Sequence, residues 1–237
     1  MRNSALISIS GLVKSFPMGR REFTALNNID LHFGSGEFAG IVGPSGSGKT
    51  TLLNIIGSLD VPTRGEAKVL GQSVGDLKPK QAARLRSKHL GFIFQTYNLL
   101  PVYTVYENVE LPLMLLKMPA AERKRAIRQS LEWVGLMDKL DSRPAQLSGG
   151  ECQRVSIARA MVKSPSIVLA DEPTANLDAE NSHNVLRTMA QLNRDLETIF
   201  IFATHDDKVI QYLRRKISLD DGQVVGDEII DSPQVGD

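Results

Sequence analysis

The spacing of apolar residues along this chain predicts where its strands and helices lie. Continuous apolar runs at 38–42, 167–170 and 198–203 predict strands that are buried on both faces, because a parallel strand covered on both sides has no polar face. Over 29–33, apolar residues alternate with polar ones, which is typical of an antiparallel strand with one face in solvent. The pattern therefore predicts an α/β fold.

Apolar residues at helical spacing predict amphipathic helices over 121–134 and 179–196, and a shorter helix is expected over 50–56. Residues 217–225 contain an Asp-Gly pair, which predicts a β-hairpin. The first of the two long helices carries basic residues beside its apolar stripe, and we expect them to form a solvated face. They are Arg123, Lys124, Arg125 and Arg128.

These elements predict a single domain over residues 1–237 that is built from lobes. Its expected parts are an α/β core with a mainly parallel sheet and flanking helices over 38–95 and 165–210, an N-terminal antiparallel β lobe over about 5–37, an inserted α-helical lobe over about 96–164 and a C-terminal hairpin over 211–230.

A glycine-rich loop follows the first buried strand and fits the phosphate-binding pattern G-x-x-x-x-G-K-[ST]. Glycine accepts the positive φ angles that a tight strand-to-helix turn needs, and it lets backbone N–H groups approach phosphate oxygens. Lys49 should reach the β- and γ-phosphates, and the Thr50 hydroxyl should bind Mg²⁺. We therefore predict a P-loop NTPase core whose ATP-binding loop comprises Gly43, Pro44, Ser45, Gly46, Ser47, Gly48, Lys49, Thr50 and Thr51.

Two acids end the second buried strand. Asp171 and Glu172 follow the apolar run 167–170, so we expect them at the carboxyl edge of the sheet, where open α/β sheets bind ligands. Phosphoryl transfer needs positioning and charge compensation rather than covalent chemistry. We predict that Asp171 holds Mg²⁺ and that Glu172 orients the attacking water. Taken alone, the pair also fits a strand-ending turn capped by acids.

The most specific motif is Leu147-Ser148-Gly149-Gly150-Glu151, which precedes an apolar pattern of helical period. Ser148 is expected to cap that helix, whose N-terminus then offers a second phosphate-binding end. With this motif the chain resembles the nucleotide-binding domain of ABC transporters, because other P-loop enzymes share only the glycine-rich loop. The resemblance implies a homodimer that sandwiches two ATP molecules, in which one copy contacts the other copy's ATP in trans through Ser148, Gly149, Gly150 and Glu151.

The same resemblance implies roles for four further residues. Gln95 matches the glutamine that reaches the metal and the attacking water, and His205 matches the histidine that contacts the γ-phosphate. Asp178 lies in the loop that crosses the dimer interface and contacts ATP in trans. Phe16 matches the aromatic residue that stacks on adenine, although tyrosine is commoner there and an ordinary core residue is the alternative. The implied catalytic residues are Glu172 and His205, and the implied Mg²⁺ ligands are Thr50, Gln95 and Asp171.

A tyrosine-rich segment follows Gln95 and contains Tyr97, Tyr103 and Tyr106. Loops dense in tyrosine and apolar residues often form interfaces, although a small satellite core has the same composition. In ABC proteins this region lies at the groove that receives a helix of the membrane subunit. The resemblance therefore implies that a separate transmembrane permease docks near Gln95–Tyr106, on the cytoplasmic side of the bacterial inner membrane.

Composition narrows the remaining possibilities. The formal net charge of +1 gives no reason to expect a nucleic-acid partner. No apolar run reaches the 18 or so residues needed to span a bilayer. The single cysteine, Cys152, excludes an internal disulfide, and we expect it in the first turn of a helix. Its ordinary interpretation is a small packed residue, and the alternative hypothesis is a reactive thiol whose pKa is lowered by the helix N-terminus.

Segments 91–101 and 107–113, together with an insert at 17–24, resemble the bacterial lipoprotein-release and macrolide-export group (LolD and MacB types). ATPases of this group drive permeases by mechanical transmission. We therefore expect an ATP-hydrolysing subunit that dimerises on ATP and drives export or lipoprotein release. Two alternatives stay open, an importer ATPase of the amino-acid type and a soluble ABC ATPase without a permease.

Overall fold

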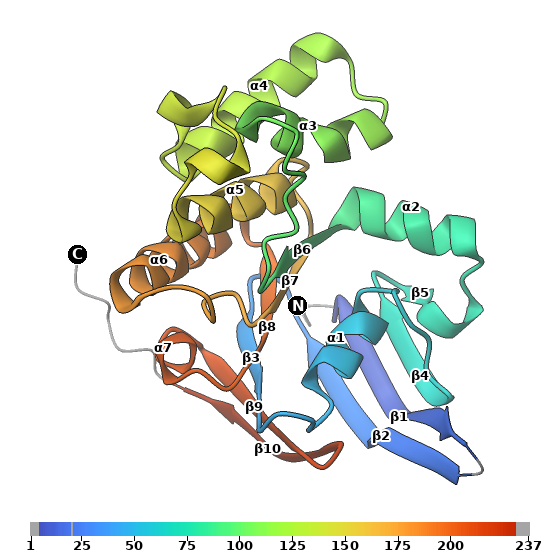
Figure 1. Ribbon diagram of the computed structural model, residues 1–237. Helices are drawn as coiled ribbons and strands as arrows, with labels where there is room; N and C mark the ends of the chain where they lie inside the picture. Colours follow the sequence, from blue (N-terminus) through green and yellow to red (C-terminus); the bar gives the residue numbers. More distant parts are fainter. Residues whose placement is uncertain (1–4, 20, 231–237) are drawn as a thin grey trace.

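The computed structural model describes residues 5–19 and 21–230 and has a six-stranded sheet at its centre (Figure 1). Its strands are β3 (Phe38–Val42), β6 (Leu90–Phe94), β7 (Ile167–Asp171), β8 (Ile199–Thr204), β9 (Arg215–Asp220) and β10 (Gln223–Ile229). The order is β10-β9-β3-β8-β7-β6, and every pair is parallel except β10 with β9. The mainly parallel sheet confirms the predicted α/β core.

A second sheet is antiparallel and has the order β2-β1-β4-β5. Its strands are β1 (Ile7–Met18), β2 (Arg21–Phe33), β4 (Arg64–Val69) and β5 (Gln72–Ser73). The prediction confined this lobe to 5–37 and assigned 64–73 to the core, which is wrong because β4 returns to pair with β1 over a long sequence separation. The predicted insert at 17–24 is the tip of the β1–β2 hairpin, where Phe16 pairs with Phe23.

The helices are α1 (Lys49–Ile56), α2 (Pro79–His89), α3 (Val105–Leu115), α4 (Ala120–Trp133), α5 (Gly149–Met161), α6 (Ala179–Leu196) and α7 (Asp207–Ile210). α1, α2 and α5 contact strands of the central sheet, whereas α3 and α4 pack against α5. The helices predicted over 50–56, 121–134 and 179–196 correspond to α1, α4 and α6. The sequence pattern did not predict α2 and α3 as individual helices. α3 even contains Pro112, a residue that usually interrupts a helix.

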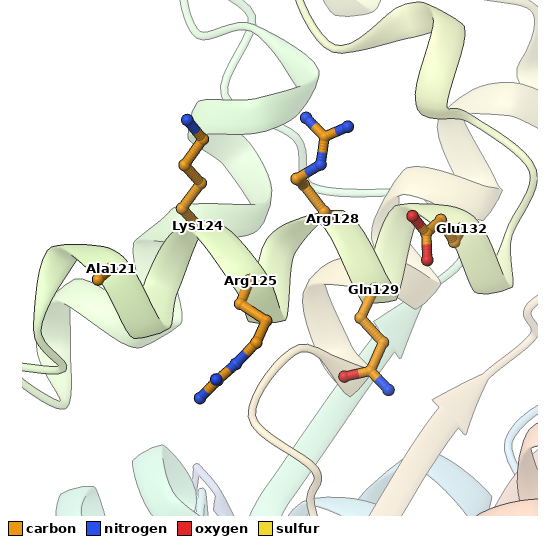
Figure 2. A pocket seen from close by; sticks show the side chains of 6 residues that line it. All are labelled: Ala121, Lys124, Arg125, Arg128, Gln129 and Glu132. Atoms are coloured by element: carbon orange, nitrogen blue, oxygen red, sulfur yellow. The ribbon is translucent and has the colours of Figure 1, made fainter.

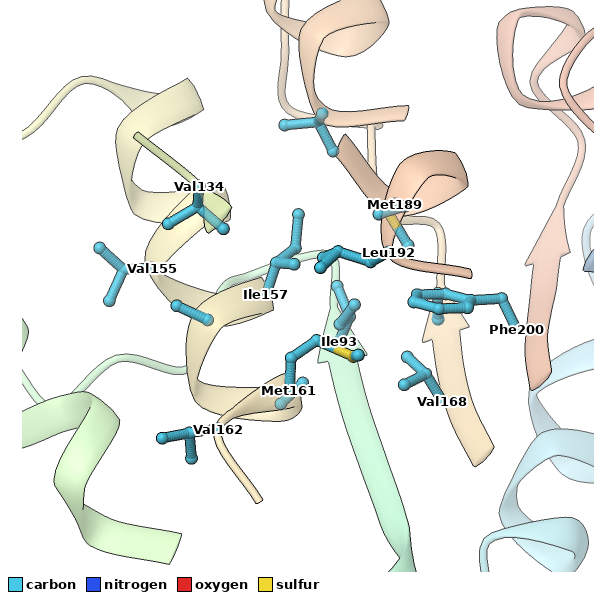
Figure 3. Packing of buried hydrophobic residues seen from close by; sticks show 14 of the residues in the cluster. Ile93, Val134, Val155, Ile157, Met161, Val162, Val168, Met189, Leu192 and Phe200 are labelled. Carbon is cyan, nitrogen blue, oxygen red and sulfur yellow. The ribbon is translucent and has the colours of Figure 1, made fainter. Parts of the chain in front are cut away.

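Alternate residues of β8 build two hydrophobic cores, because successive side chains of a strand face opposite sides of the sheet. Phe200 and Phe202 are buried in a cluster with residues of α3 to α7. Figure 3 shows part of that cluster, with α5, α6 and strand residues meeting around Phe200. Ile199 and Ile201 are buried in the second cluster, with β1, β2, β4 and α1. The central sheet is therefore covered on both faces, as its continuous apolar runs predicted.

The basic residues of α4 lie on an exposed face. Figure 2 shows Lys124 and Arg128 extending to one side of the helix while Arg125 and Gln129 extend to the other. Arg123 is the exception, because its Nε donates to Glu110 Oε1 at 2.8 Å. The exposed cations diverge and do not converge on one ligand position, as expected of a solvated face.

Among the described residues, no helix combines the length and the apolar character that crossing a bilayer requires.

The C-terminal hairpin is tied to the start of β3 through Arg215. β9 and β10 join at Asp221-Gly222, both with positive φ, as the predicted Asp-Gly turn requires. The guanidinium of Arg215 donates two hydrogen bonds to Asp227, at 2.8 and 2.7 Å, and one to Glu37 Oε2 at 2.8 Å. Its hydrogen bond lowers the pKa of Asp227 below the usual range.

We predict that Arg215→Met lowers the free energy of unfolding by about 2 kcal/mol at pH 7, because it leaves two partly buried carboxylates without their cation. The folded-state pKa of Asp227 is depressed, so its contribution to stability is present above the unfolded pKa, near 4, and is lost as pH falls further. Denaturant unfolding at pH 7 and pH 3 should show the difference between wild type and variant shrinking in acid. Arg187→Met, at an exposed position on α6, is the control and should change stability by less than about 0.5 kcal/mol.

Candidate active site

The carboxyl ends of β3, β8, β7 and β6 lie at one edge of the sheet because these neighbouring strands are all parallel. Each strand is followed at once by a predicted site residue or loop. These segments surround a cleft of about 510 Å³. The cleft is lined by Phe16, Phe23, Ala25, Ser45, Gly46, Gly48, Lys49, Thr50, Thr51, Gln95, Asp171, Glu172 and His205.

The glycine-rich loop leaves the N-terminus of α1 without a capping side chain. Its N-cap is Gly48, at φ 104°, and the first turn of α1 carries no acid. The first N–H groups of a helix have no intrahelical acceptor, so this end suits an anion such as a phosphate. The loop also has no space for a side chain at Gly43, where a Cβ would lie 2.0 Å from the Leu219 carbonyl oxygen.

Lys49 is buried beneath this loop and points its ammonium group along it. Its Nζ donates to the carbonyl oxygens of Gly43 and Pro44, each at 2.8 Å. Gly43, Pro44 and Ser47 do not line the cleft, but they hold the loop: the Ser47 N–H donates to the Pro44 carbonyl at 3.3 Å. Lys49 is thus a cation held at the phosphate-binding loop by neutral acceptors, and no carboxylate within ion-pair distance among the described residues competes for it.

Thr50 and Asp171 bring two kinds of oxygen together. The Thr50 hydroxyl lies 3.0 and 3.2 Å from the two carboxylate oxygens of Asp171. Burial raises the pKa of Asp171, and the hydrogen bond from Thr50 acts in the opposite direction. Hydroxyl and carboxylate oxygens are the ligands that Mg²⁺ prefers, and Gln95 lines the same cleft. The donor set therefore fits the predicted metal.

Glu172 is held in an uncommon backbone conformation with its carboxylate in the cleft. Its φ angle is 44°, in the left-handed region, which costs a non-glycine residue on the order of 1–3 kcal/mol. One carboxylate oxygen lies 2.6 Å from His205 Nδ1, and the other accepts from the Thr204 hydroxyl at 3.1 Å. The His205 side chain is 67% exposed, so its ring can also reach a ligand in the cleft. The arrangement brings a held carboxylate and an exposed imidazole to one place.

Two aromatic rings line the other end of the cleft. Phe16 is 38% exposed and is paired across the β1–β2 hairpin with Phe23, which is 51% exposed. Lys14 Nζ lies 4.9 Å from the centre of the Phe16 ring. The exposure argues against an ordinary core position for Phe16. Sequence reasoning missed Phe23 and Ala25, because their place in the cleft depends on how β1 and β2 pair.

The signature residues lie outside this cleft. Ser148 and Gly149 are exposed at the start of α5, whereas Gly150 is buried, and a Cβ there would lie 2.3 Å from Asn181 Oδ1. Ser148 caps α5 as predicted: its hydroxyl accepts from the Glu151 N–H at 3.2 Å, and its own N–H donates to Glu151 Oε2 at 2.8 Å. Through these two hydrogen bonds Glu151 stabilises the N-terminus of α5. None of these residues lines the cleft of their own chain.

Asp178 also lies away from the cleft and caps a helix. Its Oδ1 accepts from the Asn181 N–H at 2.8 Å, and the same backbone hydrogen bond lowers the pKa of Asp178. The side chain is exposed at the start of α6. The structure therefore separates the residues predicted to act in cis from those predicted to act in trans.

Of the two interpretations of Cys152, the structure favours the packed residue over the reactive thiol, because the side chain is buried. Burial raises the pKa of Cys152, and the neighbouring Glu151 carboxylate raises it further. Its Sγ lies 3.6 Å from the Pro144 carbonyl oxygen. Burial and a nearby negative charge outweigh the position near the helix N-terminus.

A second cavity, here called the α2–α3 groove, has a volume of about 380 Å³. It lies against β6, the strand that ends just before Gln95. Its lining is mostly apolar with three cations: Leu59, Ala83, Arg86, Ser87, Phe92, Phe94, Leu111, Pro112, Leu115, Arg159 and Lys163. None of the residues predicted for permease docking, 95–106, lines this groove. Within that segment Leu100, Val102 and Tyr103 are exposed, whereas Leu99 and Tyr106 pack against the core.

A buried asparagine that the sequence analysis overlooked shapes this exposed loop. Asn108 Oδ1 accepts from the Leu100 N–H at 2.8 Å, and its Nδ2 lies within 3.2 Å of the carbonyl oxygens of Leu100, Tyr103 and Thr104. One side chain thus contacts four backbone groups of the loop, and no local sequence signal marks it.

The family model described as ABC transporter matches residues 26–175, more than half of the chain. The chain belongs to the ABC transporter family. It is an ATPase cassette of that family, and solved cassettes share its fold over nearly their whole length. The ATP-binding cassette MJ0796, solved as a dimer in a post-hydrolysis state bound to ADP and Pi, is 39% identical, with a TM-score of 0.86 over 94% of this chain and 98% of that one.

Curated relatives of the cassette are longer proteins. A macrolide export ATP-binding/permease protein MacB of Marinobacter nauticus is 45% identical over 96% of this chain and 35% of its own length. A probable syringafactin export ATP-binding/permease protein SyfD of Pseudomonas syringae is 42% identical over 95% of this chain and 34% of its own. The cassette thus spans about a third of the length of the curated relatives it matches.

Proposed function

We propose that the cassette hydrolyses ATP with Mg²⁺ as a homodimer and drives a membrane permease of the export or lipoprotein-release type. The observation that carries the proposal is the separation of two phosphate-binding ends. The cis residues converge on one cleft, while the signature end of α5 faces solvent in the same chain. The ATP in the cleft of a second copy supplies the phosphate that this exposed end binds. A similar cassette has been solved as a dimer.

Within the cleft, Lys49 and the N–H groups at the start of α1 bind the β- and γ-phosphates. Phe16 and Phe23 flank the adenine. Thr50, Asp171 and Gln95 hold Mg²⁺, which when bound neutralises phosphate charge. These groups place the γ-phosphorus for in-line attack, and none of them forms a bond to it.

Glu172 orients and polarises the attacking water. The water oxygen bonds to the γ-phosphorus as the bond to ADP breaks, which gives ADP and phosphate. His205 holds the Glu172 carboxylate through Nδ1 and, when both ring nitrogens carry a proton, also donates from Nε2 to a γ-phosphate oxygen. Ser148, Gly149, Gly150, Glu151 and Asp178 of the partner copy close the cleft over the nucleotide.

We propose that the permease docks along the α2–α3 groove and the neighbouring residues Gln95–Tyr106. The groove supports this choice because it is apolar and because Phe94, one of its lining residues, directly precedes Gln95 of the cleft. The names of the relatives place permease and cassette in one protein, so the permease is either a separate chain, as the sequence analysis predicted, or a further part of the same polypeptide. In both cases the cassette works on the cytoplasmic face of the bacterial inner membrane.

Substitution of the water-orienting acid tests the reaction. We predict that Glu172→Gln lowers kcat by about 100-fold or more, because a neutral amide cannot stabilise the positive charge that develops on the attacking water. The affinity for ATP should stay close to wild type. It should also dimerise stably on ATP, as size-exclusion chromatography with light scattering can show. Glu180→Gln, at an exposed position on α6, serves as control and should keep wild-type turnover. Wild-type turnover in Glu172→Gln would remove Glu172 from catalysis.

Substitution of the signature serine tests the trans contact. We predict that Ser148→Arg abolishes hydrolysis and ATP-dependent dimerisation while monomeric ATP binding stays within about threefold of wild type, since the cis contacts are intact. Ser35→Arg, at an exposed serine by the opposite end of the sheet, is the control. A Ser148→Arg variant that still hydrolyses ATP as a dimer would rule out the sandwich arrangement. Thermal unfolding of both variants separates the loss of the helix cap from the loss of the contact.

Capture from native cells tests the transport assignment. The Glu172→Gln variant, tagged and trapped with ATP, should copurify after gentle solubilisation with a permease that has few transmembrane helices and a large external domain. A permease of importer type would instead assign the cassette to uptake. Recovery only in the soluble fraction, with nucleic acid or ribosomes, would contradict the transporter assignment.

A further inference from the structure

The segment that follows Gln95 has an unusual backbone. Tyr97 and Asn98 both lie in the left-handed region, with φ angles of 58° and 49°. Two consecutive non-glycine residues in that region are disfavoured and persist only where surrounding contacts hold them. Tyr97 and Asn98 begin two residues after a side chain of the ATP cleft.

Arg159 supplies two of those contacts, and Asn176 holds the start of the turn, since its Nδ2 donates to the Gln95 carbonyl oxygen at 2.9 Å. Arg159 Nη2 donates to the Tyr97 carbonyl oxygen and Nη1 donates to the Asn98 carbonyl oxygen, both at 2.6 Å. A planar guanidinium can hold two neighbouring acceptors at once, which a lysine ammonium cannot match in geometry. Burial lowers the pKa of Arg159. Among the described residues no carboxylate lies within ion-pair distance of it, so the two carbonyls are the partners that fix this cation.

The same segment meets the signature helix a second time. The hydroxyl of Tyr97 lies so close to the start of α5 that a Cβ at Gly149 would be 3.1 Å from it. Arg159 lies near the C-terminal end of α5, ten residues further along. The segment after Gln95 is therefore attached to α5 near both of its ends. Arg159 also lines the α2–α3 groove, so it touches the proposed docking surface as well.

We propose that Arg159 is a positioning residue for ATP hydrolysis, which acts by fixing the turn at Tyr97 and Asn98 and thereby the position of Gln95 in the cleft. Because Arg159 belongs to α5, it also makes Gln95 and the signature end move as one unit. The inference rests on the proposed function, since Gln95 must act in hydrolysis for its position to matter.

A double-mutant cycle on the purified full chain tests this role. Arg159→Met should lower kcat by on the order of tenfold to 100-fold with KM changed less than about threefold, because the phosphate contacts are intact and the position of Gln95 is lost. Gln95→Ala should give a similar loss. If Arg159 acts through Gln95, the double variant should be no slower than Gln95→Ala. If the two residues act independently, their fold-losses in kcat should multiply.

The matched control is Arg214→Met. Arg214 also donates from Nη2 to a backbone carbonyl, that of Gly36 at 2.9 Å, but at the end of the sheet away from the cleft. It should lower the melting temperature about as much as Arg159→Met while kcat stays within about twofold of wild type. If Arg159→Met does not fold, Arg159→Lys replaces it in the cycle. A loss of at least about threefold in kcat is then expected, because an ammonium group cannot bond both carbonyl oxygens in the geometry of the planar guanidinium.

The outcomes separate this inference from the function on which it rests. A wild-type chain that hydrolyses no ATP contradicts the proposed function itself. Normal turnover in Gln95→Ala leaves ATP hydrolysis standing and overturns the role of Arg159 together with that of Gln95. Losses that multiply in the double variant, or an unchanged kcat in Arg159→Met, overturn the role of Arg159 alone.

Discussion

The register of four parallel strands is the constraint on which the site depends. Val42 pairs with Thr204, Asp171 with Ala203, and Phe94 with Asp171, so the last residues of β3, β8, β7 and β6 form one row. The loop, the two acids, the histidine and the glutamine that follow this row are brought together for that reason. A slip of one residue in any pair would turn the side chains of that strand to the opposite face and disrupt both cores. Packing of both faces and assembly of the cleft are thus one requirement.

The cleft and the signature end divide the chemistry between different places on one chain. Lys49, Thr50, Asp171 and Glu172 lie in the cleft, whereas Ser148 faces solvent from the start of α5. Helix α5 joins the two through its contacts with the segment after Gln95. In the proposed function each end of a single copy binds phosphate and lacks its opposing surface. That would give a cassette a physical reason to act in pairs.

Much of the fold was predictable because its signals are local. The continuous apolar runs located β3, β7 and β8, and the helical period gave α6 with the bounds Ala179–Leu196. The pairing of β4 with β1 could not be predicted, since it joins residues far apart in sequence without a pattern of its own. α3 lies within the predicted helical lobe over 96–164, but its bounds were not predicted, and it contains Pro112, a residue that usually interrupts a helix. Local pattern predicts elements better than it predicts their partners.

The site shows the same limit. Motifs identified the cis residues that the structure brings to one cleft, while their individual roles stay predictions. Phe23, Asn108 and Arg159 were missed because their importance lies in contacts across the fold, with Phe16, a loop backbone and the turn after Gln95. For Cys152 the sequence left a packed residue and a reactive thiol open, and burial, which only the fold reveals, decides for the first.

The left-handed backbone at Glu172 has a consequence for laboratory evolution of this cassette. Glycine accepts a φ of 44° without steric cost, so a glycine there would relax the chain at the residue proposed to orient the attacking water. Selection for heat resistance alone would favour that exchange and, with Glu172 in its proposed role, discard the enzyme's turnover. A thermostabilised cassette library therefore needs an activity screen in every round, or position 172 kept fixed.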